Sequence, residues 1–194
     1  MTDAEDNARA AYRRMAQNNA WANATLYASV TALDADAFAA ARPGFFGSLK
    51  ETLNHIYLVD LYYVDALEQG GAGRSVYDRA EIAEPAALGA AQAEVDLRLA
   101  RFCDRLKIED LSEMRQTLRP EGTVSERVDA LLLHLFQHQI HHRGQAHVQL
   151  SAAGVAPPQL DEFYLDYDRA PSAQAYFSAP SGGGAPTKDT RDGI

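Results

Sequence analysis

The sequence is poor in cysteine, in long apolar runs and in basic residues. Cys103 is its single cysteine, which excludes an internal disulfide. No uninterrupted apolar run approaches the roughly 18 residues that suggest a membrane-spanning helix. Its 18 Lys and Arg stand against 27 Asp and Glu, a net charge of −9 that repels phosphate backbones. We therefore expect neither nucleic acid nor an anionic membrane as a partner.

Residues 1–6 have neither the basic start nor the apolar run of a signal peptide, so the expected compartment is the cytoplasm. With 194 residues and 46% hydrophobic content, the chain suits one domain with a core of its own. We place this domain at residues 1–170. The tail, residues 171–194, is rich in Gly, Pro and Ser, and is linker-like at 181–186. Tyr176 and Phe177, just before that stretch, are expected to dock on the domain.

Several catalytic motifs are also missing. There is no Gly-x-Gly-x-x-Gly, Walker loop, Gly-x-Ser-x-Gly or Cys-x-x-Cys. The Glu-x-x-His pairs of di-iron bundles are absent, because Thr52 precedes His55 and Leu135 precedes His138 at the Glu position. Gln139 likewise stands where a His-Glu-x-x-His protease carries its Glu. Any metal site is therefore expected to be mononuclear.

Apolar residues recur at helical spacing in four segments. The first helix is expected over about residues 4–33. The second begins at the capping box Ser48 to Glu51 and ends at Gly70-Gly71. The third begins at Pro85 and extends to about Leu106.

The helical period lapses between residues 107 and 122, where 114–118 suggests a short extended segment followed by a turn. A second capping box at Thr123 to Glu126 predicts a fourth helix from Ser125 to Ala153, with Gly154 as its stop. The expected fold class is all-α, an antiparallel four-helix bundle with a long connection between helices 3 and 4.

Histidines cluster in the fourth helix. Five of the six fall between residues 134 and 147, and His138 and His142 are four residues apart, on one face of a helix. The same spacing argument equally permits His134 with His138, or His138 with His141. His55 is the exception, alone in the second helix, and is the natural third ligand if it faces the pair.

Three elements occur in a characteristic order. They are Leu53-Asn54-His55 with Asp60 five residues on, His138-x-x-x-His142-Arg143-Gly144-Gln145, and Gly154-x-x-Pro157-Pro158-x-Leu160-Asp161. Over roughly residues 10–168 the chain resembles the DinB/YfiT-like family of bacterial four-helix metal-binding proteins. That resemblance implies a divalent metal on His55, His138 and His142, and a homodimer. It implies no single reaction, since relatives include thiol-dependent transferases and isomerases. His134, His141 and His147 then become outer, surface or dimer-contact residues.

Three neutral imidazoles leave one coordination position open, as in catalytic zinc sites. An ion there can lower the pKa of a bound water or thiol toward neutrality. We expect zinc or nickel, and a metal-dependent hydrolase or thiol-dependent transferase acting on a small molecule. The alternative is a non-catalytic, stress-associated dimeric scaffold. No general acid or base can be named, so the catalytic residues remain unknown.

Four further expectations concern packing. Asp60 is either an exposed acid or a partner of Arg143. Gly144, inside a helix, indicates a tight helix crossing. Cys103 is expected to be a buried, inert thiol. The homodimer is also favoured by the fourth helix, whose apolar residues exceed what one core face absorbs; these are Leu131, Leu132, Leu133, Leu135 and Phe136.

Overall fold

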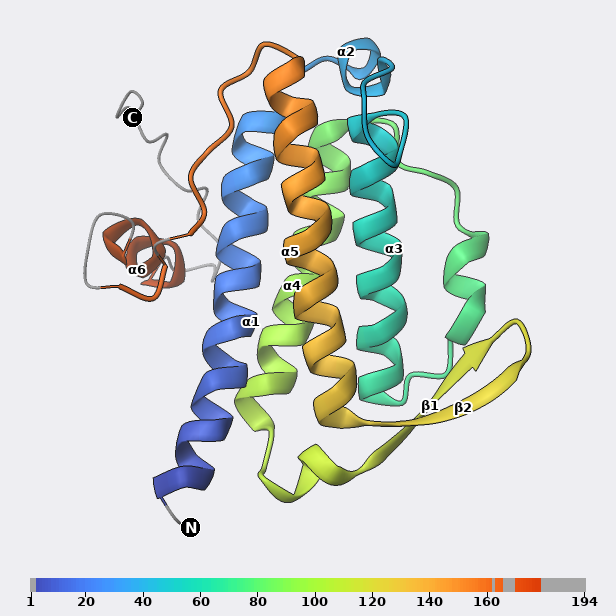
Figure 1. Cartoon of the computed structure of the whole chain (residues 1–194), viewed down its shortest axis with the longest axis vertical. Coiled ribbons are helices and arrows are strands. Elements are labelled where there is room, and N and C mark those ends of the chain that lie inside the picture. Colours follow the sequence, from blue (N-terminus) through green and yellow to red (C-terminus); the bar gives the residue numbers. More distant parts are fainter. Residues whose placement is uncertain (1–2, 162, 166–169, 179–194) are drawn as a thin grey trace.

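Four long helices lie side by side and form a bundle (Figure 1). The computed structural model describes residues 3–161, 163–165 and 170–178. The helices are α1 (Asp3–Val30), α3 (Leu49–Glu68), α4 (Pro85–Arg105) and α5 (Val128–Ala152). The expected four-helix bundle is confirmed.

The helices do not simply alternate in direction. Asp60 of α3 contacts Gln92 of α4, and Glu68, further along α3, contacts Arg98, further along α4. These two helices are therefore parallel. The segment between them, which contains η1 (Gly73–Asp78), returns the chain to the end where α3 began (Figure 1). As a result α1 is antiparallel to α4, and α3 is antiparallel to α5, with two long connections instead of the one expected.

Local signals place most of the helix ends correctly. The Ser48 hydroxyl accepts the Glu51 backbone N–H at 3.2 Å, and the Glu51 carboxylate accepts the Gly47 N–H at 2.8 Å. This capping interaction satisfies two backbone donors at the start of α3. Pro85 occupies the first turn of α4, where its missing N–H costs nothing. Gly154 follows α5 with a φ of 77°, a left-handed conformation that favours glycine.

The predicted start of the fourth helix is wrong. α5 begins at Val128, and the residues of the second capping-box pattern instead lie in β2 (Gly122–Arg127). That strand pairs antiparallel with β1 (Met114–Arg119), in a register running from Met114 opposite Arg127 to Arg119 opposite Gly122. Pairing with β1 satisfies backbone groups that the pattern assigned to a helix. The extended segment and turn expected near residues 114–122 are present.

Two short helices complete the connections. α2 (Ala35–Ala39) lies where an interruption was expected, and Asp34 caps it by accepting the Ala37 N–H at 2.8 Å. η2 (Glu109–Ser112) precedes the hairpin.

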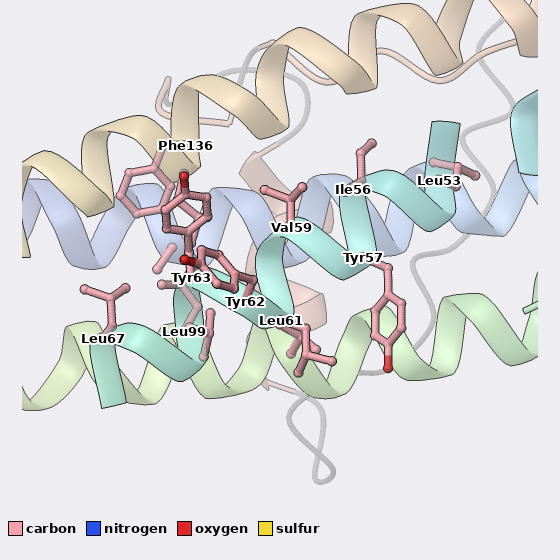
Figure 2. Close-up of a cluster of buried hydrophobic side chains, with 14 of the residues drawn as sticks. Leu53, Ile56, Tyr57, Val59, Leu61, Tyr62, Tyr63, Leu67, Leu99 and Phe136 are labelled. Carbon is pink, nitrogen blue, oxygen red and sulfur yellow. The ribbon is translucent and has the colours of Figure 1, made fainter. Parts of the chain in front are cut away.

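The core is apolar and receives residues from every long helix. Figure 2 shows part of it, with a row of α3 residues that runs from Leu53 to Leu67, where Leu67 lies near Leu99 of α4. Cys103 is buried here, and burial raises the pKa of its thiol to about 12. The expectation of a buried thiol is therefore confirmed, and a raised thiol pKa is the condition under which a cysteine is a weak nucleophile.

The apolar residues of the fourth helix are mostly covered by the chain itself. Leu131, Leu132, Leu135 and Phe136 are buried, and only Leu133, at 59% exposure, faces solvent. Four of the five residues on which the dimer expectation rested thus need no partner.

The start of the tail packs against the bundle. In α6 (Ala170–Ser178), Tyr176 is buried beside Trp21 of α1, with Phe177 partly buried beside it. The expected docking of these two aromatic residues is confirmed. The linker-like stretch 181–186 lies outside the described residues. Among the helices that are described, none has the length and hydropathy needed to cross a membrane.

Candidate metal centre

Three histidines from two neighbouring helices meet at one point of the bundle. His55 of α3 and His138 and His142 of α5 each offer a ring nitrogen, and these nitrogens lie within 4.8 Å of one another. The antiparallel packing of α3 against α5 produces this meeting. The structure therefore brings together the three residues that were selected as metal ligands.

The spacing of these nitrogens fits a metal ion. His55 Nε2 and His138 Nε2 are 3.0 Å apart. Two Zn–N bonds of about 2.0–2.1 Å in a tetrahedral arrangement give a separation of about 3.3 Å. The other ring nitrogen of His138 is buried without a hydrogen-bond partner. The donor set and its spacing thus suit a divalent ion that prefers imidazole.

Gln145 orients the third histidine. Its side-chain oxygen lies 2.9 Å from His142 Nδ1, so this nitrogen carries the proton and Nε2 keeps its lone pair. The Gln145 amide nitrogen lies 3.1 Å from His141 Nε2. A hydrogen bond to the non-ligating nitrogen is how proteins commonly fix the ring of a metal-binding histidine. It gives a physical role to the last residue of the His-Arg-Gly-Gln motif.

The surroundings keep the three imidazoles neutral. Desolvation, followed by the nearby His142, lowers the pKa of His55 to about 4. Desolvation and the neighbouring histidines, His142 first, lower the pKa of His138 to about 3. The pKa of His142 is lowered by desolvation, against an opposing contribution from its bond to Gln145. Because a metal needs neutral imidazole, these shifts favour coordination near neutral pH.

An aromatic side chain covers part of the cluster. The Phe46 ring, from the loop before α3, lies 4.5 Å from the His55 ring and 5.6 Å from the His142 ring. Phe45 packs edge-on against Phe46 at 5.0 Å and is 82% exposed. The site therefore has an apolar wall on the side of this loop.

Comparison with known proteins gives the same assignment over nearly the whole chain. The family model described as the DinB family matches residues 1–173. The chain belongs to the DinB family. It is 26% identical over 157 residues to Protein DinB of Bacillus subtilis (strain 168), an alignment that spans 76% of this chain and 89% of that protein.

The fold also matches that of a solved DinB-like protein. The crystal structure of a DinB-like protein from Bacillus cereus ATCC 10987 superposes with a TM-score of 0.57 at 16% identity, covering 72% of this chain and 90% of that one. At this identity the likeness establishes the fold alone. The resemblance to the DinB family that the motifs indicated is confirmed.

The remaining histidines of this DinB-family chain lie outside the three-histidine group. The ring of His134 is 6.0 Å from that of His138, whereas the rings of His138 and His142 are 4.4 Å apart. His141 is exposed, and His147 lies 2.9 Å from the Pro158 carbonyl oxygen. Of the three pairings that spacing permitted, the pair facing His55 is His138 with His142.

Gln139 and Arg143 each follow a metal-ligand candidate on α5 by one residue, and their side chains are buried in the core. The Arg143 Nη1 atom donates to Asn19 at 2.5 Å, to Asn23 at 3.1 Å and to Gln139 at 3.1 Å. The side-chain nitrogen of Gln139 donates in turn to the carboxylate of Asp60. The exposed-acid alternative for Asp60 is therefore wrong, because it is only 1% exposed, and its pairing with Arg143 is indirect, through Gln139. The motif places metal-facing and core-facing residues side by side.

Two carboxyl groups share this buried network. Asp96 accepts hydrogen bonds from Asn19, Asn23 and Gln92, whereas Asp60 Oδ1 has no donor. Desolvation raises the pKa of Asp96 to about 7, and desolvation followed by Asp96 raises the pKa of Asp60 well above its ordinary value. Because donors surround Asp96, we assign the ionised form to Asp96 and the proton to Asp60.

The tight helix crossing expected at Gly144 is not made within the described chain. A Cβ atom built on Gly144 meets no atom within 4 Å, and the residue faces solvent. No helix of the described chain crosses α5 closely there.

Sequence reasoning missed several residues of this region. Phe46 lies in a loop with no periodic pattern, and nothing in the sequence placed it over His55. Asn19, Asn23, Gln92 and Asp96 are polar residues on the core-facing sides of amphipathic helices, and their helical spacing toward the core was the available signal. Gln139 could have been found because it precedes Arg143 by four residues, as His138 precedes His142.

Proposed function

We propose that this chain holds one divalent ion between His55, His138 and His142. With that ion, we propose, it acts as a metal-dependent enzyme on a small molecule, either a hydrolase or a thiol-dependent transferase. The convergence of three neutral imidazole nitrogens supports this most directly. Among the described residues, no carboxylate or cysteine adds a fourth donor to the group. Three protein ligands with a free position are typical of catalytic zinc, whereas structural zinc has four.

When bound, such an ion supplies Lewis acidity, which brings the pKa of a water or thiol at the free position near neutrality. The protein's own side chains do the rest. Gln145 holds His142 in the orientation that presents Nε2. Phe46 limits the approach of water across the His55 and His142 rings. Imidazole donors suit zinc and nickel, and we propose one of these as the resident ion.

Metal content decides the first half of this proposal. Elemental analysis of the protein as isolated is expected to find about one zinc or nickel ion per chain, because three imidazoles form one mononuclear site. Replacing His55, His138 or His142 with Ala should each abolish tight binding. His147→Ala is the matched control, since it removes a histidine of α5 outside the cluster and should keep the ion. Stoichiometric metal in His55→Ala would remove α3 from the site.

Turnover decides the second half. Metal-loaded protein would be assayed for ester and amide hydrolysis and for addition of thiols to electrophiles, with His142→Ala as the inactive reference. Turnover that requires the ion supports the enzyme. The alternative is a non-catalytic, stress-associated dimeric scaffold. It is favoured by the lack of an assigned general acid or base and by the exposed α5 face described next.

We also propose a homodimer formed through α5. Its outward face carries Leu133, Ile140 and Val148, which are 59%, 54% and 64% exposed, with Gly144 between the last two. Their spacing of seven, four and four places them along one side of the helix. An uncovered apolar stripe of this kind suits a second copy of α5, and Gly144 would let the two backbones approach closely. Light scattering at micromolar concentration tests this, and a monomer would refute it.

A further inference from the structure

A row of side chains extends from the histidine cluster toward the β-hairpin. His134 lies one helical turn before His138 on α5, and its ring is 4.8 Å from the ring of Tyr63 on α3. The Arg119 guanidinium, at the end of β1, lies 5.7 Å from the centre of the Tyr63 ring. Figure 1 shows the hairpin beside the end of α3, and Figure 2 shows Tyr63 on that helix. A cation therefore stands on the same side of α3 and α5 as the metal ligands.

Arg119 is only weakly engaged by acidic groups. Its Nη1 donates to the Tyr63 hydroxyl at 3.0 Å, and its Nη2 lies 3.5 Å from a Glu126 oxygen. Close guanidinium–carboxylate bonds are about 2.7–2.9 Å long. Arg127, by contrast, is held by both oxygens of Asp129, at 3.0 and 2.7 Å. The Arg119 side chain is 34% exposed, so solvent and solutes reach it.

Contacts other than those of Arg119 hold the β-hairpin against α3. The Tyr62 hydroxyl donates to the Leu118 carbonyl oxygen at 2.6 Å, and Arg115 Nε donates to the Leu67 carbonyl oxygen at 3.0 Å. Thr117, between them, is 1% exposed. These contacts hold β1 against α3, so the fold does not require the Arg119 guanidinium.

The surroundings single out this position as cationic in an acidic protein. The net charge of the chain is −9, so a positive group at the edge of the site is not a property of the surface as a whole. Arg74 lies over the Tyr77 ring at 6.0 Å, and the Tyr77 ring is 5.4 Å from that of Tyr62. The field of Arg119 reaches His134, whose pKa is lowered by desolvation first and by Arg119 second, against an opposing contribution from Glu126.

We propose that Arg119, with the Tyr63 hydroxyl and His134, forms an anion-binding subsite for the substrate of the metal centre. The substrate class is then a small molecule with a reactive group at one end, which meets the ion, and a carboxylate or phosphate at the other. The planar guanidinium matches either group. This inference rests on the proposed function, because the metal centre defines the reacting end.

The test compares matched thiols on cobalt-loaded protein. Thiol sulfur on Co²⁺ changes the visible absorption spectrum, so titration with mercaptohexanoate and with mercaptohexanol gives two affinities that differ only through the terminal group. We expect the carboxylate to bind about tenfold more tightly at low salt, the effect of one charge-assisted pair. Arg119→Gln should remove this preference, and Arg119→Lys should restore part of it. Arg127→Gln, with the same change in charge on β2, should leave it intact.

Each outcome separates this inference from the proposed function. Equal affinities for the two thiols, or a preference that survives in Arg119→Gln, would overturn the subsite while leaving the metal centre. If no thiol alters the cobalt spectrum, the thiol chemistry of the proposed function fails. A metal-free measurement then decides the subsite. Inorganic phosphate should shift the His134 ring-proton resonance of the native chain and not that of Arg119→Gln, and no shift in the native chain would overturn the proposal.

Discussion

Acid should release the metal far less readily than histidine ligands ordinarily allow. The perturbation is a change from pH 7 to pH 5, at which protons compete with the ion for His55, His138 and His142. For a histidine with the ordinary pKa near 6.5, this competition weakens binding about 30-fold at pH 5, so three such ligands lose roughly 10⁴-fold. A sequence with three histidines therefore predicts release between about pH 6 and 5.

Burial of the site makes the expected loss of metal affinity at pH 5 much smaller. With pKa values lowered to about 4 for His55 and about 3 for His138, these two imidazoles remain neutral at pH 5 in the metal-free protein. Protonation of these two ligands together then lowers the metal affinity less than about twofold at pH 5. The pKa of His142 is also lowered, so its share stays below that of an ordinary histidine. The total loss of metal affinity between pH 7 and pH 5 should be less than about 30-fold.

Calorimetric titration of the metal-free protein with zinc at pH 7 and pH 5, corrected for the buffer, measures this difference. A loss near 10⁴-fold would mean that burial does not protect the ligands. The same shifts give the sign for the metal-free fold. The unfolded chain takes up protons below about pH 6.5, whereas the folded site does not, so stability should fall as pH decreases from 6.5 toward the folded pKa values. Denaturant melts of His138→Ala, which removes one such group, should show a shallower fall.

Three further predictions follow from individual contacts. Gln145→Leu should weaken metal affinity about 10- to 100-fold by freeing the His142 ring, measured by competition with a chelator; unchanged affinity would mean that the bond to Gln145 orients nothing. Asp60→Asn should be at least as stable as the native protein in denaturant at pH 8, because it removes a buried acid whose raised pKa makes native stability fall as pH rises; a loss above about 2 kcal/mol would show that Asp60 is needed as an anion. Ile140→Glu should convert the proposed dimer to monomer in light scattering, whereas Val124→Glu, the same kind of change on an exposed β2 residue, should not; a dimer in both variants would place the interface elsewhere, and a native chain that is already monomeric would refute the dimer.

The bundle could be predicted because its helices carry strong local signals. Ser48, Pro85 and Gly154 each act within one turn of the chain, so their effect can be read from neighbouring residues. The strand pairing of residues 122–127 could not be predicted. Thr123 to Glu126 has a capping-box pattern that favours a helix start, but pairing with β1 is the more stable arrangement. The parallel course of α3 and α4 likewise depends on where residues 69–84 lead, and no local pattern encodes that direction.

At the candidate site, spacing could predict the pair on α5 but not its surroundings. His138 and His142 follow from helical periodicity, and the family resemblance added His55. Phe46 and Arg119 come from a loop and a hairpin, whose positions relative to the bundle arise only from tertiary packing. The polar core escaped prediction for a different reason. An Asp or Asn in a helix is usually solvent-exposed, so only the packing of all four helices around Arg143 reveals these residues as an internal network.

The pairing of α3 with α5 gives the three-histidine site a consequence for the whole chain. His55 and His138 are 83 residues apart in sequence, so an ion held between them would act as a cross-link that closes the segment containing α4 and the β-hairpin into one loop. Closing a loop of this length in the unfolded state is equivalent to about 4.5 kcal/mol in the chain-entropy model of disulfides. A protein whose one cysteine is buried would thereby have a cross-link equivalent to a disulfide, which a chelator can remove but a reductant cannot.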